Sequence, residues 1–264
     1  EVSAALSQFA SGVPAQGRAI LCADNPGTAR IARELGPRAL TYGFSEAADV
    51  RGTVSLQGGG FPRVTGRGPL GSFSFTLGVG GEMNALNALG AMALAHTLDI
   101  SPSLAGRSLS AFRGVSRRLE WKGRKGTIDV WDDYGHHPTE IAATLKALRE
   151  RNAGRRLVTL FQPHRISRTR ALWSEFTEAF TLTDELWLAN IYAAGEIPEA
   201  EITAERLVEA IRARGQAARF AGSLEAALSL ALHELRENDV FLTLGAGNVV
   251  DVADVFLSEK GISK

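Results

Sequence analysis

Two carboxylates, a phenol and two imidazoles follow one another where a predicted strand turns into a predicted helix. The segment from Val130 to Ile141 reads Val-Trp-Asp-Asp-Tyr-Gly-His-His-Pro-Thr-Glu-Ile. β-Branched and aromatic residues favour a strand up to Trp131, and Pro138 is typical of a first helical turn. In open α/β sheets, ligands bind at the carboxyl ends of the strands. We therefore predict a ligand site at this turn; the alternative is a capped turn with a hydrogen-bonded histidine.

A second turn carries a histidine and several arginines. The segment 157–170 reads Leu-Val-Thr-Leu-Phe-Gln-Pro-His-Arg-Ile-Ser-Arg-Thr-Arg, so a buried-type strand again runs into a polar turn and a helix. We expect His164, Arg165 and Arg168 to face the same edge of the sheet as His136. Because guanidinium groups bind carboxylate and phosphate oxygens, the turn predicts an anion site. A solvated basic helix start is the alternative.

A glycine-rich turn follows the last predicted strand. Gly245, Ala246, Gly247 and Asn248 open a helix, and their exposed backbone N–H groups could hold an anion. A plain tight turn explains this sequence equally well. The long turn at 190–196 follows another strand, and we expect it beside the same pocket.

Two further pairs lie nearer the amino terminus. Asn84 and Asn87 are three residues apart, so they share a helix face near its start. An amide offers the paired donor and acceptor that adenine requires, although capping or surface asparagines explain the pair too. Arg117 and Arg118 lie in a connector that we interpret as a domain boundary, with a solvated hinge as the alternative.

The motifs identify the chain as similar to the Mur ligases. The resemblance rests on four segments in the family's order, namely 84–88, 132–141, 161–170 and 245–248. It covers essentially the whole chain, which corresponds to about the back half of a family member. The run Phe-Gln-Pro-His-Arg at 161–165 separates the member that adds the first amino acid from the sister ligases that add later ones.

The resemblance implies roles for individual residues. Asn84 and Asn87 would lie at the adenine of ATP, Arg118 would belong to the same ATP site, and Asp133 would lie near the ribose or phosphates. The implied catalytic residues are His136, Arg165 and Arg168. The implied residues for binding the amino acid and the reacting carboxylate are Tyr134, His136, His164, Arg165, Arg168, Gly245, Ala246 and Gly247.

The reaction that the resemblance implies is ATP-dependent peptide-bond formation in peptidoglycan precursor synthesis. The γ-phosphoryl group of ATP activates a carboxylate, and an amine then displaces phosphate from the acyl phosphate. The implied cofactors are ATP and Mg²⁺, and the implied substrates are UDP-N-acetylmuramate and L-alanine. The family's Gly-x-x-Gly-Lys-Thr phosphate loop does not occur in these 264 residues. Since the magnesium-binding residues and the uridine-binding domain would also lie outside this chain, we expect no metal ligand in it and no activity from it alone.

Two other functions stay open. The chain could be a nonenzymatic remnant that binds an amino acid or a cell-wall precursor, or part of a sister ligase that adds a preformed peptide. A generic nucleotide-binding Rossmann enzyme fits less well, because no Gly-x-Gly-x-x-Gly follows an early strand.

Composition restricts the partners. The formal net charge is zero, so bulk electrostatics predict neither nucleic acid nor an anionic membrane as a partner. The single cysteine, Cys22, excludes an internal disulfide framework and agrees with a cytoplasmic location. We expect neither a signal peptide nor a membrane-spanning segment within these 264 residues.

The pattern of elements predicts an α/β fold in two domains. Residues 1–115 would form the C-terminal portion of a central ATP-binding domain, with a β-α-β unit followed by antiparallel strands and helices. Residues 116–264 would form a Rossmann-like amino-acid-binding domain. Its expected strands are 126–132, 156–161, 185–189, 217–220 and 239–244. Its expected helices are 138–151, 168–180, 203–214, 223–235 and 248–259.

Overall fold

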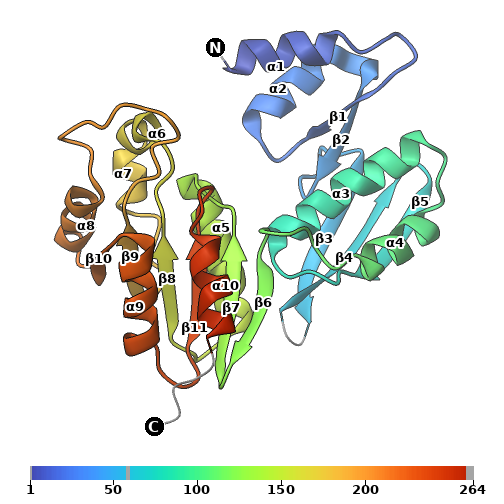
Figure 1. Cartoon of the computed structure of the whole chain (residues 1–264). Helices are drawn as coiled ribbons and strands as arrows, with labels where there is room; N and C mark the ends of the chain where they lie inside the picture. Colours follow the sequence, from blue (N-terminus) through green and yellow to red (C-terminus); the bar gives the residue numbers. More distant parts are fainter. Residues whose placement is uncertain (1, 58–59, 260–264) are drawn as a thin grey trace. The chain divides into compact units, whose positions relative to one another are not determined.

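The structure, a computed structural model, describes residues 2–57 and 60–259. The chain divides into two compact units, Glu1–Arg113 and Gly114–Lys264 (Figure 1). The division falls close to the expected boundary after residue 115.

The first unit is built on a mixed sheet with the strand order β1-β2-β3-β4-β5. The strands are β1 (Ala19–Cys22), β2 (Ala39–Gly43), β3 (Val50–Gln57), β4 (Phe61–Gly68) and β5 (Gly71–Thr76). The helices are α1 (Val2–Ser11), α2 (Pro26–Leu35), the short 3-10 helix η1 (Gly36–Arg38), α3 (Glu82–Thr97) and α4 (Pro102–Ala111). Strands β1 to β3 are parallel and β3 to β5 antiparallel, so the expected β-α-β unit and antiparallel meander are both present.

Helix α3 covers the core of the first unit. Its apolar residues Ala85, Leu89 and Met92 are buried against strand residues such as Val64. The close approach depends on Gly52 of β3, where a Cβ atom would lie 2.6 Å from a methyl carbon of Leu89. A side chain at this position would push the helix off the sheet.

The second unit is built on a sheet with the strand order β10-β9-β8-β11-β7-β6. Its strands are β6 (Glu120–Lys125), β7 (Ile128–Asp133), β8 (Leu157–Phe161), β9 (Glu185–Ala189), β10 (Ala218–Gly222) and β11 (Val240–Leu244). Its helices are α5 (Pro138–Arg151), α6 (Ile166–Ala171), α7 (Trp173–Phe176), α8 (Ala204–Ala213), α9 (Leu224–Glu234) and α10 (Val250–Ser258). All neighbouring strands pair in parallel except β6, which is antiparallel to β7.

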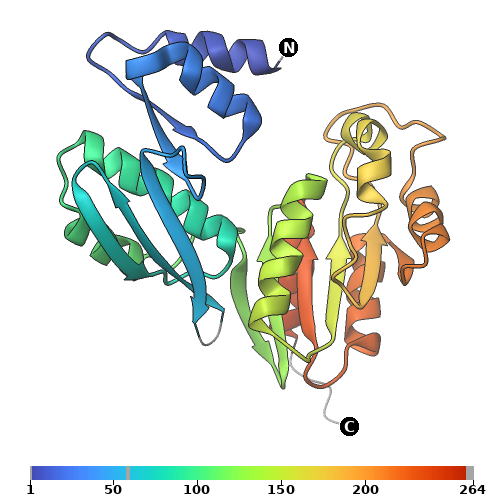
Figure 2. The same cartoon turned by 180° about the vertical axis from the view of Figure 1, so that it is seen from behind.

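Helices cover both faces of this sheet, which makes the unit a three-layer α/β structure of the Rossmann-like kind expected. Helices α5, α7 and α8 bury Leu145, Phe176 and Leu207 against one face. Helices α9 and α10 bury Ala231 and Phe256 against the other. Figure 1 looks onto the face with α9 and α10, and Figure 2 onto the face with α5.

Two expectations for the second unit were wrong in detail. Strand β6 was not expected, because its sequence Glu-Trp-Lys-Gly-Arg-Lys is charged and contains a glycine. Such a sequence suits a sheet edge, where charges discourage pairing with another chain. The expected helix 168–180 begins earlier and is broken into α6 and α7, because Leu172 leaves the helical region with φ −114° and ψ 26°.

Candidate functional site

The candidate site lies at the carboxyl ends of four parallel strands of the second unit. The loops that follow β7, β8, β9 and β11 contain residues 134–137, 162–165, 190–196 and 245–248. The chain turns from β7 and β8 into helices on one face, whereas β11 lies between them and leads to α10 on the other face. Such a reversal opens a crevice at the strand ends, which is where open α/β sheets bind ligands.

Four aromatic rings form a row across this edge. The rings of Tyr134 and His136 are 5.5 Å apart and nearly perpendicular. The His136 ring lies 6.1 Å from that of His164, which stacks on Tyr192 at 5.4 Å with an interplanar angle of 11°. The structure therefore brings His136 and His164 together, as expected from the two turn sequences.

Glu140 fixes the turn that carries His136. Its carboxylate accepts hydrogen bonds from the backbone N–H groups of His136 (3.0 Å) and His137 (3.2 Å), while the His137 side chain caps α5. Burial acts to raise the pKa of Glu140, but these donors outweigh it and the pKa lies below its ordinary value. Glu140 is thus ionised at neutral pH and holds the loop in place.

The contacts of the two imidazoles give them opposite hydrogen-bonding roles. His136 Nδ1 lies 3.1 Å from the carbonyl oxygen of Tyr134, which can only accept, so this bond needs a proton on Nδ1. In the neutral ring this leaves Nε2 as an acceptor. His164 Nδ1 lies 3.2 Å from Nη1 of Arg168, which can only donate, so this bond leaves the His164 proton on Nε2. Burial lowers the pKa of His164, and Arg168 lowers it further.

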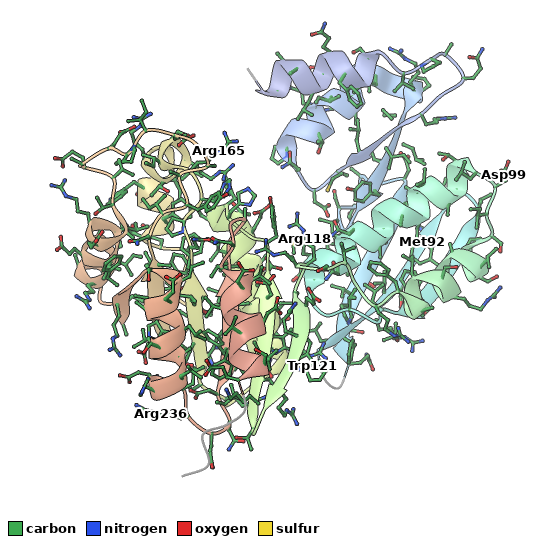
Figure 3. All side chains as sticks on the ribbon, in the orientation of Figure 1. Met92, Asp99, Arg118, Trp121, Arg165 and Arg236 are labelled. Atoms are coloured by element: carbon green, nitrogen blue, oxygen red, sulfur yellow. The ribbon has the colours of Figure 1, made fainter. Side chains whose placement is uncertain are left out.

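The arginines at the start of α6 supply positive charge. Arg165 directly precedes the helix with a left-handed backbone (φ +71°), and its guanidinium group is half exposed (Figure 3). Arg168 also donates to the carbonyl oxygen of His164 at 3.1 Å. Glu196, from the loop after β9, lies 3.9 Å from Arg165 and accepts from the backbone and hydroxyl of Ser167 at 2.9 and 2.6 Å. These contacts attach the β9–α8 loop to the basic turn.

The glycine-rich loop packs tightly against Gln162. A Cβ atom on Gly245 would lie 2.6 Å from the Gln162 carbonyl oxygen, and one on Gly247 would lie 2.3 Å from the Gln162 amide oxygen. Gln162 is buried and donates to the Asn248 side chain at 3.2 Å. Close packing therefore requires these glycines, in addition to any role of their N–H groups.

Asp133 and Arg118, both expected at ATP, have different surroundings. The Asp133 carboxylate is buried inside the turn, where it accepts from the backbone N–H groups of Leu119 and Gly135, both at 2.7 Å. Burial raises its pKa, and the hydrogen bonds offset only part of that effect. Arg118 lies with its guanidinium carbon 5.6 Å from the centre of the Tyr134 ring (Figure 3).

Asn84 and Asn87 belong to the first unit, on α3. The Asn84 amide donates to the carbonyl oxygen of Gly80 at 2.7 Å, while Asn87 is exposed. Both asparagines thus belong to a different unit from the row of aromatic rings.

Sequence reasoning missed two residues that the structure connects to the site. Tyr192 was part of an expected neighbouring loop but was not singled out, and it stacks on His164. Arg117 was interpreted only as part of the connector at the domain boundary, yet it donates to the buried Asp132 and to the glycine-rich loop. A carboxylate within a buried strand must find a partner, and this signal could have pointed to a nearby arginine.

Within residues 2–57 and 60–259, no cluster of three or more histidine, cysteine or acidic side chains could hold a metal ion. In the same described part of the chain, no helix combines the length and apolarity needed to cross a bilayer.

Comparison with known proteins gives consistent matches. The model of the Mur ligase middle domain matches residues 1–95, and that of the Mur ligase glutamate ligase domain matches residues 117–247. A protein from Geobacter sulfurreducens named UDP-N-acetylmuramate–L-alanine ligase is 42% identical over 255 residues, which cover 95% of this chain and 55% of that protein. The chain thus spans about half the length of the curated relatives it matches.

Solved structures share the fold. A UDP-N-acetylmuramate–alanine ligase from Thermotoga maritima matches 90% of this chain and 50% of its own, with a TM-score of 0.73 and 24% identity. A MurF ligase from the same organism, solved in complex with ADP, matches 92% of this chain and 54% of its own, with a TM-score of 0.65 and 18% identity. From both domain matches and the shared architecture, we conclude that the chain belongs to the Mur ligase family.

Proposed function

We propose that the protein containing these two units is an ATP-dependent ligase that joins L-alanine to UDP-N-acetylmuramate through an acyl phosphate, in peptidoglycan precursor synthesis. The observation that carries the proposal is the pair of imidazoles with opposite hydrogen-bonding roles beside Arg165 and Arg168. The Geobacter relative's name gives the same reaction for a protein that matches nearly all of this chain.

The second unit would bind and orient the amino acid. The free Nε2 of His136 accepts a hydrogen bond from the alanine amine, which must present its lone pair to attack. The Nε2–H group of His164 and the guanidinium groups of Arg165 and Arg168 donate to carboxylate or phosphate oxygens. Tyr134 and the glycine-rich loop at 245–247 would close the pocket.

The bond changes follow from this arrangement. The amine nitrogen attacks the carbonyl carbon of the acyl phosphate, and the bond from that carbon to the phosphate oxygen breaks. The amine's proton passes to the departing phosphate, which leaves as HPO₄²⁻ with its negative charge stabilised by Arg165 and Arg168. His136 positions the amine in this scheme and need not act as the base.

The first unit would hold the adenine of ATP at Asn84 and Asn87, and Arg118 would belong to the same ATP site. ATP supplies the phosphoryl group, and Mg²⁺ would be held by residues outside this chain. Asp133 would lie near the ribose or the phosphates. The ADP complex of the Thermotoga MurF ligase supports a nucleotide in this fold. We further propose a cytoplasmic location, where such precursors and ATP would be available.

Binding can be tested on the 264-residue chain by NMR. It has five histidines, so ¹³C-labelled histidine gives few signals to assign. L-Alanine should shift the ring signals of His136 and His164 and leave His233 of α9 unchanged. Arg168→Ala should weaken the response, and Arg214→Ala, which removes an exposed ion pair with Glu178, is the matched control. Equal shifts at His233, or none at either site histidine, would refute alanine binding here.

Turnover requires the whole gene product. Phosphate release that needs ATP, UDP-N-acetylmuramate and L-alanine together would support the ligase. Release that needs a preformed peptide in place of L-alanine would indicate a sister ligase. A gene product that binds alanine but never releases phosphate would instead support the nonenzymatic remnant.

A further inference from the structure

Arg117 joins three separate parts of the second unit. Its Nε donates to Asp132 on β7 at 3.0 Å. Its two terminal nitrogens donate to the carbonyl oxygens of Gly247 at 3.0 Å and Gly245 at 2.6 Å, in the loop between β11 and α10. All three nitrogens of one planar guanidinium group are thereby used, a pattern that lysine cannot reproduce.

The same residue also reaches the loop after β7. The guanidinium carbon of Arg117 lies 5.1 Å from the centre of the Tyr134 ring, and the Arg117 carbonyl oxygen accepts from the Tyr134 backbone N–H at 2.7 Å. Arg117 itself adopts a left-handed backbone (φ +60°), and its N–H donates to Glu120 at 2.8 Å. Both the backbone and the side chain of Arg117 are therefore held by hydrogen bonds.

Neutralising Asp132 would not by itself require this geometry. Asp132 is fully buried and also accepts from the Thr243 hydroxyl at 2.6 Å, so one further charged donor would satisfy it. The two bonds to Gly245 and Gly247 go beyond that need. They hold the glycine-rich loop against β7, directly beside the rings of the candidate site.

We infer that Arg117 is a positioning residue, which fixes the loop 245–248 and the Tyr134 ring relative to β7 and so preorganises the pocket. The effect of Arg117 on L-alanine binding rests on the proposed function, whereas its effect on the order of the loop does not. In this arrangement Arg117 acts on the substrate only through the groups that it holds.

The first test measures the loop itself. Hydrogen–deuterium exchange of the peptide around 245–248 should become faster in Arg117→Ala and stay unchanged in Arg124→Ala. The latter is a matched control, because Arg124 pairs with Asp129 at the other end of β7, with bonds of 2.7 and 3.1 Å. Unchanged exchange in Arg117→Ala would overturn the inference.

A double variant separates positioning from charge neutralisation. Arg117→Ala leaves the buried charge of Asp132 unpaired, and Arg117→Ala/Asp132→Asn removes that charge. The midpoint of urea unfolding should therefore be lowered in the single variant and return most of the way to the wild-type value in the double variant. The loop should nevertheless exchange as fast as in the single variant, because the bonds to Gly245 and Gly247 are still missing. If the double variant restores wild-type protection of the loop, Arg117 serves only as a counter-charge and the inference is wrong.

The second test measures the ligand. Loss of two hydrogen bonds that order the loop should weaken L-alanine binding about tenfold in Arg117→Ala, and in the double variant too. Added guanidinium ion should restore part of the affinity, and Arg117→Lys should not. An unchanged alanine affinity despite a mobile loop would overturn the link to the pocket. If the wild type binds no alanine, the proposed function fails, while the exchange experiment still decides the role of Arg117.

Discussion

Asp129 offers a quantitative test of how ion pairs stabilise the second unit. This carboxylate, near the start of β7, is 7% exposed and accepts from Arg124, from Arg155 and from the Trp121 indole. Burial acts to raise its pKa, but the hydrogen bonds and charges outweigh burial and bring the pKa down from 3.8 to about 2. The folded state therefore favours the ionised form.

The size and sign of the effect follow from linkage. A carboxylate whose pKa is lower in the folded state adds to the free energy of unfolding above its unfolded pKa, and this contribution disappears as the pH falls through the folded value. The difference of about 2 between the two pKa values corresponds to about 2 kcal/mol at about pH 6. At about pH 3 roughly half of this contribution is left, so about 1 kcal/mol is lost between these two conditions.

Tryptophan fluorescence isolates the relevant unit, because all four tryptophans lie in the second unit. They are Trp121, Trp131, Trp173 and Trp187. Urea unfolding of the wild type and of Asp129→Asn should give a difference in unfolding free energy that shrinks by about 1 kcal/mol from about pH 6 to about pH 3. Asparagine does not titrate, so the change with pH reports Asp129 alone.

The control is Asp254→Asn, which removes a half-exposed carboxylate paired with Lys122 at 2.9 Å. An exposed pair of this kind contributes at most about 1 kcal/mol, so its difference should vary little with pH. A difference for Asp129→Asn that stays constant, or that grows as the pH falls, would refute the reasoning.

Three further predictions concern the site and the core. Gly247→Ala would place a methyl group 2.3 Å from the amide oxygen of Gln162, so either the buried Gln162 side chain or the loop must shift. We expect L-alanine binding measured by calorimetry to weaken about tenfold, and an unchanged affinity would contradict this. Arg168→Ala should raise the pKa of His164 toward 6.5 in an NMR titration, because a neighbouring positive charge is lost. A pKa below that of the wild type would contradict this prediction. Leu145→Ala should lower the unfolding free energy by about 2–5 kcal/mol in tryptophan-monitored urea unfolding, because the side chain is fully buried, and a loss well below that range would contradict tight packing.

Most of the fold could be predicted from local sequence patterns. Strand β8 is apolar except for Thr159 and is fully buried, and a proline marks the first turn of α5, so both were expected within a residue or so of their bounds. Strand β6 has no such signal, because its charged sequence becomes a strand only by pairing with β7. The break at Leu172 likewise depends on how the segment packs in three dimensions.

The site was partly predictable for a topological reason. The rule that ligands bind at the carboxyl ends of parallel strands placed His136 and His164 at one edge, and their rings are 6.1 Å apart. Arg117 could not be found in this way, since its carbonyl partners lie 128 and 130 residues further along the chain. The sequence explained Gly247 only by anion binding or a tight turn. Its close packing against Gln162 could not be predicted, because it depends on two loops that are distant in sequence.

The sheet of the second unit keeps two polar clusters at opposite ends of its strands. Asp129, Arg124 and Arg155 lie at the amino end of β7, and the imidazoles and arginines of the candidate site lie beyond the carboxyl ends. A strand of this length spans about 17–20 Å. The two clusters share no residue, so a substitution in one leaves the contacts of the other in place. Evolution, or a protein engineer, can vary amino-acid selectivity at one end while the ion pairs at the other continue to hold the unit together.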